Sequence, residues 1–165
     1  MRIGDSEEFD SFGDTDPRKM PSHLFHGALS LNYDSAGRAD TTKQNFSVCP
    51  RHWYIDTVFR CEACCTEFIF SVKEQRFWYE EREFYVDSLP LRCPACRKQE
   101  RRIKLLKQQY DSLISDAVRG KDLTAKQVVV EILDELASVS YCFSERMTEC
   151  HRLLLKQIKK QQDNQ

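Results

Sequence analysis

The sequence lacks a long apolar run. It contains no stretch of about 18 apolar residues, the length that a membrane-spanning helix requires. Its first residues also lack the order of a basic segment followed by an apolar one that is typical of a secretory signal. The sequence therefore predicts neither a spanning helix nor secretion, and we expect the protein in the cytoplasm with no membrane partner.

The sequence also lacks a large net charge of either sign and a large apolar fraction. Its 25 Lys and Arg residues nearly balance 26 Asp and Glu, so the formal net charge is −1 and no global field favours a nucleic-acid or membrane partner. Charged residues make up 31% of the chain and the mean hydropathy is −0.60, which leaves little material for a core. We expect a small domain stabilised by a metal, together with helices.

Cysteine, by contrast, is abundant, with eight in 165 residues. Four of them form two Cys-x-x-Cys pairs with 28 residues between the pairs, Cys61 with Cys64 and Cys93 with Cys96. Two residues between cysteines let one tight turn direct both sulfurs at a single ion, and two such turns supply the four ligands of tetrahedral Zn²⁺. In a reducing compartment this pattern is more often metal-binding than disulfide-bonded. The spacing predicts one structural zinc ion with no open coordination position for a substrate.

The first 47 residues form an acidic segment, with five Lys and Arg against eight Asp and Glu. Their apolar residues follow neither a helical nor a strand period for long. Such a segment buries too little surface to offset its chain entropy. We therefore predict a disordered tail over residues 1–47.

Residues 48–97 carry the patterns of strands around the first cysteine pair. Apolar and polar residues alternate over Trp53–Arg60 and again from Phe68, which predicts a short hairpin with Cys61 and Cys64 at its tip. Ser71 and Glu74 then form a capping box that predicts a short helix over residues 72–81. We expect the aromatic residues of this segment to cover the metal hairpin, since about 50 residues cannot fold on aliphatic burial alone.

Several motifs in this segment carry a family resemblance. They are the block Cys49-Pro-Arg-His-Trp-Tyr, the first cysteine pair, Phe68-Ile-Phe-Ser, Glu74-Gln-Arg-Phe-Trp-Tyr-Glu-Glu and Cys93-Pro-Ala-Cys-Arg97. Together they resemble the probable zinc-ribbon family found in many bacterial proteins, over about residues 49–98. The resemblance implies a structural zinc site at Cys61, Cys64, Cys93 and Cys96 and implies no established biochemical activity.

Cys65, Cys49 and His52 lie near the cysteine pairs and are further candidates for metal ligands. Many turns of this family place glycine after the second cysteine, where this sequence has Cys65. Cys65 is either a strained structural residue or an alternative ligand to Cys64. Cys49 with His52 could contribute to a second metal site, but no further ligand pair is evident, and we expect an ordinary thiol at Cys49.

Residues 98–165 show helical periodicity. An apolar stripe from Ile103 to Ala117 predicts a first helix that ends at Gly120 in a left-handed cap. Thr124 and Gln127 form a second capping box. The helix that follows should run to Lys160, with a stripe that includes Met147, Cys150, Leu154 and Ile158. The sequence thus predicts a small α+β zinc ribbon followed by an antiparallel α-helical hairpin with a long C-terminal helix.

The length of the second helix suggests a partner. Its distal stripe would extend beyond the reach of a first helix that ends near Gly120, and exposed apolar patches usually mark an interface. We expect binding to another protein or self-association through this helix. The basic segment 97–107, with six positive residues and one negative, could bind nucleic acid but is more readily explained as a solvated helix face.

Three classes of function fit these observations. The favoured one is a non-enzymatic zinc-ribbon adaptor that binds other proteins, since no group of residues shows a catalytic spacing. The second is a zinc-ribbon protein associated with nucleic acid or transcription. The third is a rubredoxin-like iron protein for electron transfer, disfavoured because the sequence lacks Gly-rich acidic loops and carries long helices.

Overall fold

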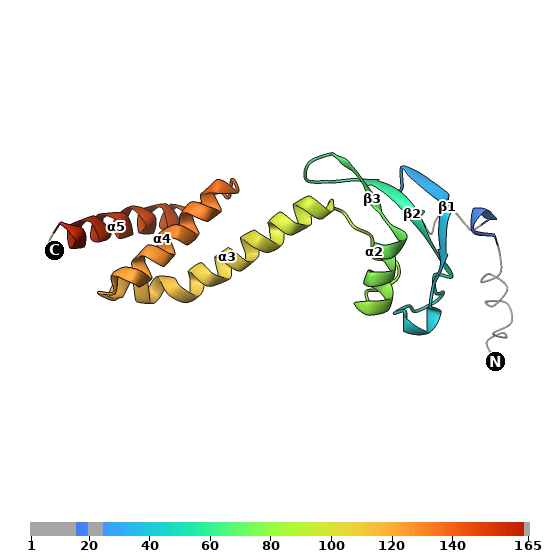
Figure 1. The fold of residues 1–165 in the computed structure, drawn as a ribbon, viewed down its shortest axis with the longest axis horizontal. Coiled ribbons are helices and arrows are strands. Elements are labelled where there is room, and N and C mark those ends of the chain that lie inside the picture. Colours follow the sequence, from blue (N-terminus) through green and yellow to red (C-terminus); the bar gives the residue numbers. More distant parts are fainter. Residues whose placement is uncertain (1–15, 20–24, 164–165) are drawn as a thin grey trace. The chain divides into compact units, whose positions relative to one another are not determined.

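A computed structural model describes residues 16–19 and 25–163 of the chain (Figure 1). Spatial contacts divide the chain into two compact units, Met1–Pro94 and Ala95–Gln165. The first contains the strands and the short helices, and the second contains nearly all of three long helices. In the described part of the chain, no helix is both long and apolar enough to cross a membrane.

The first unit is built on a three-stranded antiparallel sheet in the order β1-β2-β3. The strands are β1 (Ser30–Arg38), β2 (Trp53–Arg60) and β3 (Glu67–Phe70). In the pairing of β2 with β3, Phe59 lies opposite Phe68. The alternation in the sequence therefore predicted both strands and their pairing correctly.

Strand β1 shows that the predicted tail over residues 1–47 is wrong for much of its length. Ser30–Arg38 pairs with β2, with a register shift between Asn32 and Gly37. The side chain of Phe25 is also buried. β1 is an edge strand whose partners in β2 lie between 53 − 38 = 15 and 58 − 30 = 28 positions away, and its polar and apolar residues alternate only over residues 30–34. Residues 1–15 and 20–24 lie outside the described part of the chain.

Helix α2 (Val72–Arg76) continues directly into η4 (Phe77–Glu81), a segment of π-helix, and the predicted helix over residues 72–81 is confirmed. The Ser71 hydroxyl accepts a hydrogen bond from the Glu74 amide at 3.2 Å, as the capping pattern predicted. Gly37 lets β1 approach this helix closely, since a Cβ there would lie 2.9 Å from Cγ1 of Val72.

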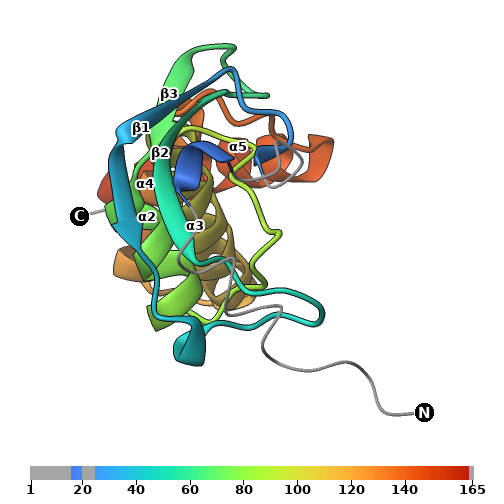
Figure 2. The same cartoon turned by 90° about the vertical axis from the view of Figure 1, so that its right-hand side faces the viewer.

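One buried amide joins α2 to two strands. The Gln75 side chain is 2% exposed, and its Nε2 donates hydrogen bonds to the carbonyls of Ile55 at 2.6 Å and Phe70 at 2.8 Å. Figure 2 shows α2 beside the sheet from a second direction. Because a buried carbonyl without a donor is costly, Gln75 fixes the position of α2 on β2 and β3.

We expect Gln75→Leu to destabilise the first unit by about 1–3 kcal/mol, chiefly through the Phe70 carbonyl, because the Ile55 carbonyl also accepts from the Thr57 hydroxyl at 2.8 Å. Urea unfolding followed by the fluorescence of Trp53 and Trp78 would measure the change. Lys73→Ala, on the exposed side of the same helix, is the matched control and should change stability by no more than about 0.5 kcal/mol. Equal effects of the two substitutions would contradict the bridging role of Gln75.

The second unit differs from the predicted hairpin because it contains three helices. They are α3 (Pro94–Arg119), α4 (Leu123–Ser138) and α5 (Glu145–Gln162). Helix α4 returns along α3, with Arg102 paired to Glu135 and the Gln99 side chain donating to the Val139 carbonyl. The predicted helix over residues 125–160 is therefore wrong as a single element.

A Schellman motif interrupts that predicted helix. The Tyr141 amide donates to the Leu136 carbonyl and the Ser140 amide to the Ala137 carbonyl, with Ser140 at φ 58°. Ser144 then starts α5, its hydroxyl accepting from the Met147 amide at 3.3 Å. The sequence hid this break because the left-handed position carries serine in place of the usual glycine, while the apolar stripe continues on both sides.

The start of α4 and the end of α3 also differ from prediction. Asp122, one residue before the helix, caps α4 by accepting from the Thr124 amide, so Thr124 is not the cap. Gly120 is not among the residues with positive φ, and the predicted left-handed cap is wrong. Glycine is needed there because a Cβ would lie 2.6 Å from the Asp116 carbonyl oxygen.

The break lets α5 fold back on α4. Three polar contacts place the two helices antiparallel: His151 with Asp134 at 3.0 Å, Lys126 with Gln157 at 2.8 Å, and Gln161 with the Lys121 carbonyl at 3.2 Å. The core between the three helices includes Leu106, Tyr110, Ala117, Val129, Leu133, Leu136, Met147 and Leu154. The stripe expected to be an exposed interaction surface thus lies largely inside the helical unit.

We expect Leu154→Ala to destabilise the helical unit by about 2–5 kcal/mol, because Leu154 is 0% exposed and its removal leaves a cavity. Chemical denaturation followed by far-UV circular dichroism would measure this. Leu155→Ala is the matched control. Leu155 is 46% exposed, so this substitution should change the free energy of unfolding by no more than about 0.5 kcal/mol. If both substitutions were neutral, α5 would not be docked on α4.

Candidate metal centre

The first cysteine pair lies in the turn between β2 and β3. Cys61 follows the last residue of β2, and its amide donates to the Thr66 carbonyl at 2.9 Å, which closes the turn. The Cys65 amide donates back to the Cys61 carbonyl at 2.9 Å. Cys65 has φ 59°, the left-handed conformation that explains why glycine is common at this position in similar turns. This backbone path turns the chain sharply immediately after Cys64.

The second pair lies at the start of a helix. Cys93 directly precedes α3, and Cys96 falls in its first turn, where the sequence had predicted a second tight turn and a helix only from residue 98. Pro94 is the first helical residue, a position that favours proline because the missing amide hydrogen would have no partner there. The metal ligands and the helix therefore share the same few residues.

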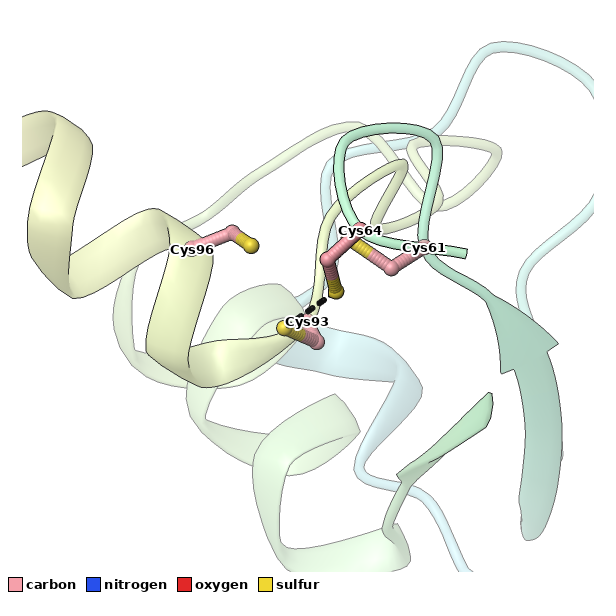
Figure 3. A group of neighbouring side chains, drawn as sticks. All are labelled: Cys61, Cys64, Cys93 and Cys96. Carbon is pink, nitrogen blue, oxygen red and sulfur yellow. Dashed lines mark hydrogen bonds between the residues drawn. The ribbon is translucent and has the colours of Figure 1, made fainter. Parts of the chain in front are cut away.

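The four predicted ligands converge. The sulfurs of Cys61, Cys64, Cys93 and Cys96 all lie within 4.8 Å of one another, and Figure 3 shows them directed into one space. The Cys64 and Cys93 sulfurs are 3.8 Å apart. A tetrahedral ion with metal–sulfur bonds of about 2.3 Å would separate its ligands by about 3.8 Å. The donor set and its spacing fit a four-coordinate metal ion.

Backbone amides prepare Cys61 to be a ligand. Its side chain is buried, and hydrogen bonds from the amide of Cys93, then from those of Cys64 and Ala63, lower its pKa to about 6 against the opposing effect of burial. Since only the thiolate binds a metal, this shift favours binding near neutral pH. At Cys49, burial and the carboxylate of Asp87 raise the thiol pKa instead.

One backbone contact in the centre could not be read from the sequence. The Glu62 amide, inside the first turn, donates to the Leu91 carbonyl at 2.9 Å. This bond ties the turn to the segment that leads into the second cysteine pair. No side-chain type signals it, because both partners are main-chain atoms.

The other candidate ligands stay apart from this centre. Across residues 16–19 and 25–163, the four cysteines are the one group of three or more His, Cys, Asp or Glu residues placed to hold a metal ion. Cys65 is exposed and outside the group, and Cys49 and His52 form no second site there. In the structure, Cys64 and not Cys65 is the fourth member of the group placed to hold a metal ion.

Comparison with known families agrees with this geometry. Residues 55–104 match the family model of a probable treble clef domain. The matched segment begins in β2, ends in α3 and includes all four cysteines. No curated protein and no solved structure matches the chain. The treble clef domain covers under a third of the sequence and confirms the predicted four-cysteine, zinc-ribbon-like module.

We expect Cys64→Ser to reduce bound metal, since a neutral hydroxyl replaces a thiolate ligand. Cys65→Gly is the matched control at the next residue, and it should retain metal and relieve the left-handed backbone strain. Metal content measured by mass spectrometry of the purified, dialysed variants would compare them. The reverse result, with metal lost from Cys65→Gly and kept in Cys64→Ser, would make Cys65 the ligand.

Proposed function

We propose that this protein is a non-enzymatic zinc-binding adaptor. One structural Zn²⁺ ion is held by Cys61, Cys64, Cys93 and Cys96, and the helical unit presents a binding surface. The observation that carries the proposal is the position of Cys96 in the first turn of α3, which makes the metal centre and the start of the helix a single structural element.

The four-thiolate donor set suits zinc or a tetrathiolate iron centre, and we propose zinc because long helices follow the cysteines in place of Gly-rich acidic loops. Soft thiolates in tetrahedral geometry select Zn²⁺ or iron–sulfur centres, and zinc adds no redox chemistry. A rubredoxin-like iron centre uses the same four ligands, so a red colour in the purified protein would favour iron and a colourless protein zinc.

The closed ligand set supports a structural role. Four thiolates complete a tetrahedral shell, so neither water nor a substrate has a position to occupy on the ion. Metal binding then contributes to folding, which in comparable small zinc modules is worth about 10 kcal/mol or more.

A reducing compartment such as the cytoplasm is part of the proposal. None of the eight cysteines, all in the described part of the chain, forms a disulfide, and the four at the centre must be thiolates to bind.

The partner surface of the adaptor belongs on the outside of the helical unit. The side chains first expected to form it are largely covered by α4, as Leu154 and Met147 are buried. Large apolar side chains of the three helices do remain exposed, namely Leu105, Val118, Val128, Leu153 and Leu155. We propose that a partner protein, or a second copy of the chain, binds at this outer surface.

Metal analysis and chelation test the structural role. We expect one zinc per colourless chain, and we expect Cys96→Ser to lose zinc and the near-UV signal of the first unit while the helical far-UV signal largely persists. Cys142→Ser, an exposed cysteine outside the group, is the matched control and should keep both.

Affinity capture from the native cell tests the adaptor role. Proteins retained by the intact chain and lost with Cys96→Ser would be metal-dependent partners. Full zinc content and an unchanged near-UV signal in Cys96→Ser would contradict the metal assignment, and the absence of any protein captured specifically by the intact chain would contradict the adaptor role.

A further inference from the structure

The near-zero net charge conceals two oppositely charged units. Residues 95–165 contain 14 Lys and Arg against 10 Asp and Glu, a net charge of 14 − 10 = +4. Residues 1–94 contain 11 against 16, a net charge of 11 − 16 = −5. An asymmetry of this kind between the parts of a chain is typical of proteins that bind an anionic polymer. The whole-chain value of −1 is therefore a poor guide to the electrostatics of the helical unit.

Three of these 14 cations lie on one face of α3. Lys98, Arg101 and Lys104 follow one another at spacings of three residues, and all three are exposed. At about 100° per residue they fall within about 120° of the helix circumference, opposite the buried Leu106 and Tyr110. We call these three residues the α3 basic face.

One acidic residue, Glu100, lies beside the cations of this face on α3. Within residues 16–19 and 25–163, Lys98, Arg101 and Lys104 form no ion pair, whereas Arg102 on the flank of the helix pairs with Glu135. Lys104 also borders an open groove of about 390 Å³ whose lining includes Glu100 and Asp111, so acidic side chains border the face on that side.

The position of this charge runs against helix electrostatics. The N-terminal half of a helix carries partial positive charge and favours acidic residues, yet the first turn of α3 contains none. A tetrathiolate metal centre at Cys96 would offset the nearest cation. Lys104 is eight residues further on, about 12 Å along the axis, which exceeds the screening length of about 8 Å at physiological ionic strength. Basic residues in the first turns of a helix break this local rule, and departures of this kind are expected at functional sites.

A polyphosphate ligand fits this face better than a bilayer does. A basic helix that lies on a membrane inserts its apolar face among the lipids. In α3 that apolar face, with Leu106, Tyr110 and Ala117, is buried in the core of the helical unit. What remains is a row of cations on a helix, which suits the evenly spaced charges of a nucleic-acid backbone.

We propose that the α3 basic face binds the phosphate backbone of nucleic acid. This inference goes beyond the adaptor role, because it adds a second class of ligand at a surface distinct from the metal centre. It would make the protein a link between nucleic acid and a bound protein.

Fluorescence anisotropy with the full zinc-loaded chain tests the proposal, using labelled 20-nucleotide single-stranded RNA, single-stranded DNA and duplex DNA. Three phosphate contacts predict a slope of log affinity against log salt of about −2 to −3, or a loss of about 20- to 40-fold between 50 and 200 mM salt. The triple variant Lys98→Gln, Arg101→Gln, Lys104→Gln should lose at least tenfold in affinity, and its slope should become shallower by about 2.

A matched variant controls for the change in charge. Lys156→Gln, Lys159→Gln and Lys160→Gln remove the same charge from exposed positions of α5 and should change affinity by less than twofold. Circular dichroism and zinc content should be the same for both triple variants, so that a folding defect is distinguished from lost binding.

Several results would overturn the proposal. Equal losses from the two triple variants would indicate a diffuse positive field, and tighter binding to phosphatidylserine vesicles than to any of the three nucleic acids would indicate a membrane ligand. A chain that holds one zinc and binds none of the nucleic acids would reject this inference and leave the metal centre intact.

Discussion

Four sulfurs that must meet at one point impose the main constraint on this protein. The turn between β2 and β3 supplies two of them, and the residues around the start of α3 supply the others. The backbone serves this requirement in several places, with the left-handed Cys65, the proline at the first helical position and the bond from Glu62 to Leu91. The sheet has three short strands, and their apolar burial alone would scarcely stabilise it. The convergence of the four sulfurs fixes the geometry of the turn between β2 and β3.

The sequence predicted the metal centre well because its information is local. A Cys-x-x-Cys spacing specifies a ligand pair without reference to the rest of the fold, and the alternation around Trp53–Arg60 specifies a half-buried strand. The family resemblance rests on the same segment, and the matched treble clef domain covers it. The sequence did not show that the second pair belongs to a helix, since Cys-Pro-Ala-Cys is compatible with either a turn or a first helical turn.

The sequence predicted the rest of the fold less well, for identifiable reasons. Strand β1 is held by pairing with β2 across the sequence, which local periodicity cannot reveal. The break before α5 depends on a left-handed Ser140, and serine is an ordinary residue in many other contexts. Gly120 looked like a left-handed cap, but its role is to avoid the Asp116 carbonyl. In each case a tertiary or backbone requirement overrides a local preference.

The place of Cys96 in α3 has a consequence for how the chain folds as it is synthesised. Chains fold from the N-terminus as they emerge from the ribosome. The first cysteine pair is followed by 28 residues before the second pair begins, so the fourth ligand, Cys96, is made last. The sheet can pair before then, but its turn at Cys61 and Cys64 stays incomplete. The helical unit forms afterwards from residues made after the centre can close. A metal ion that binds this centre would therefore act on the nascent chain before the helical unit is complete.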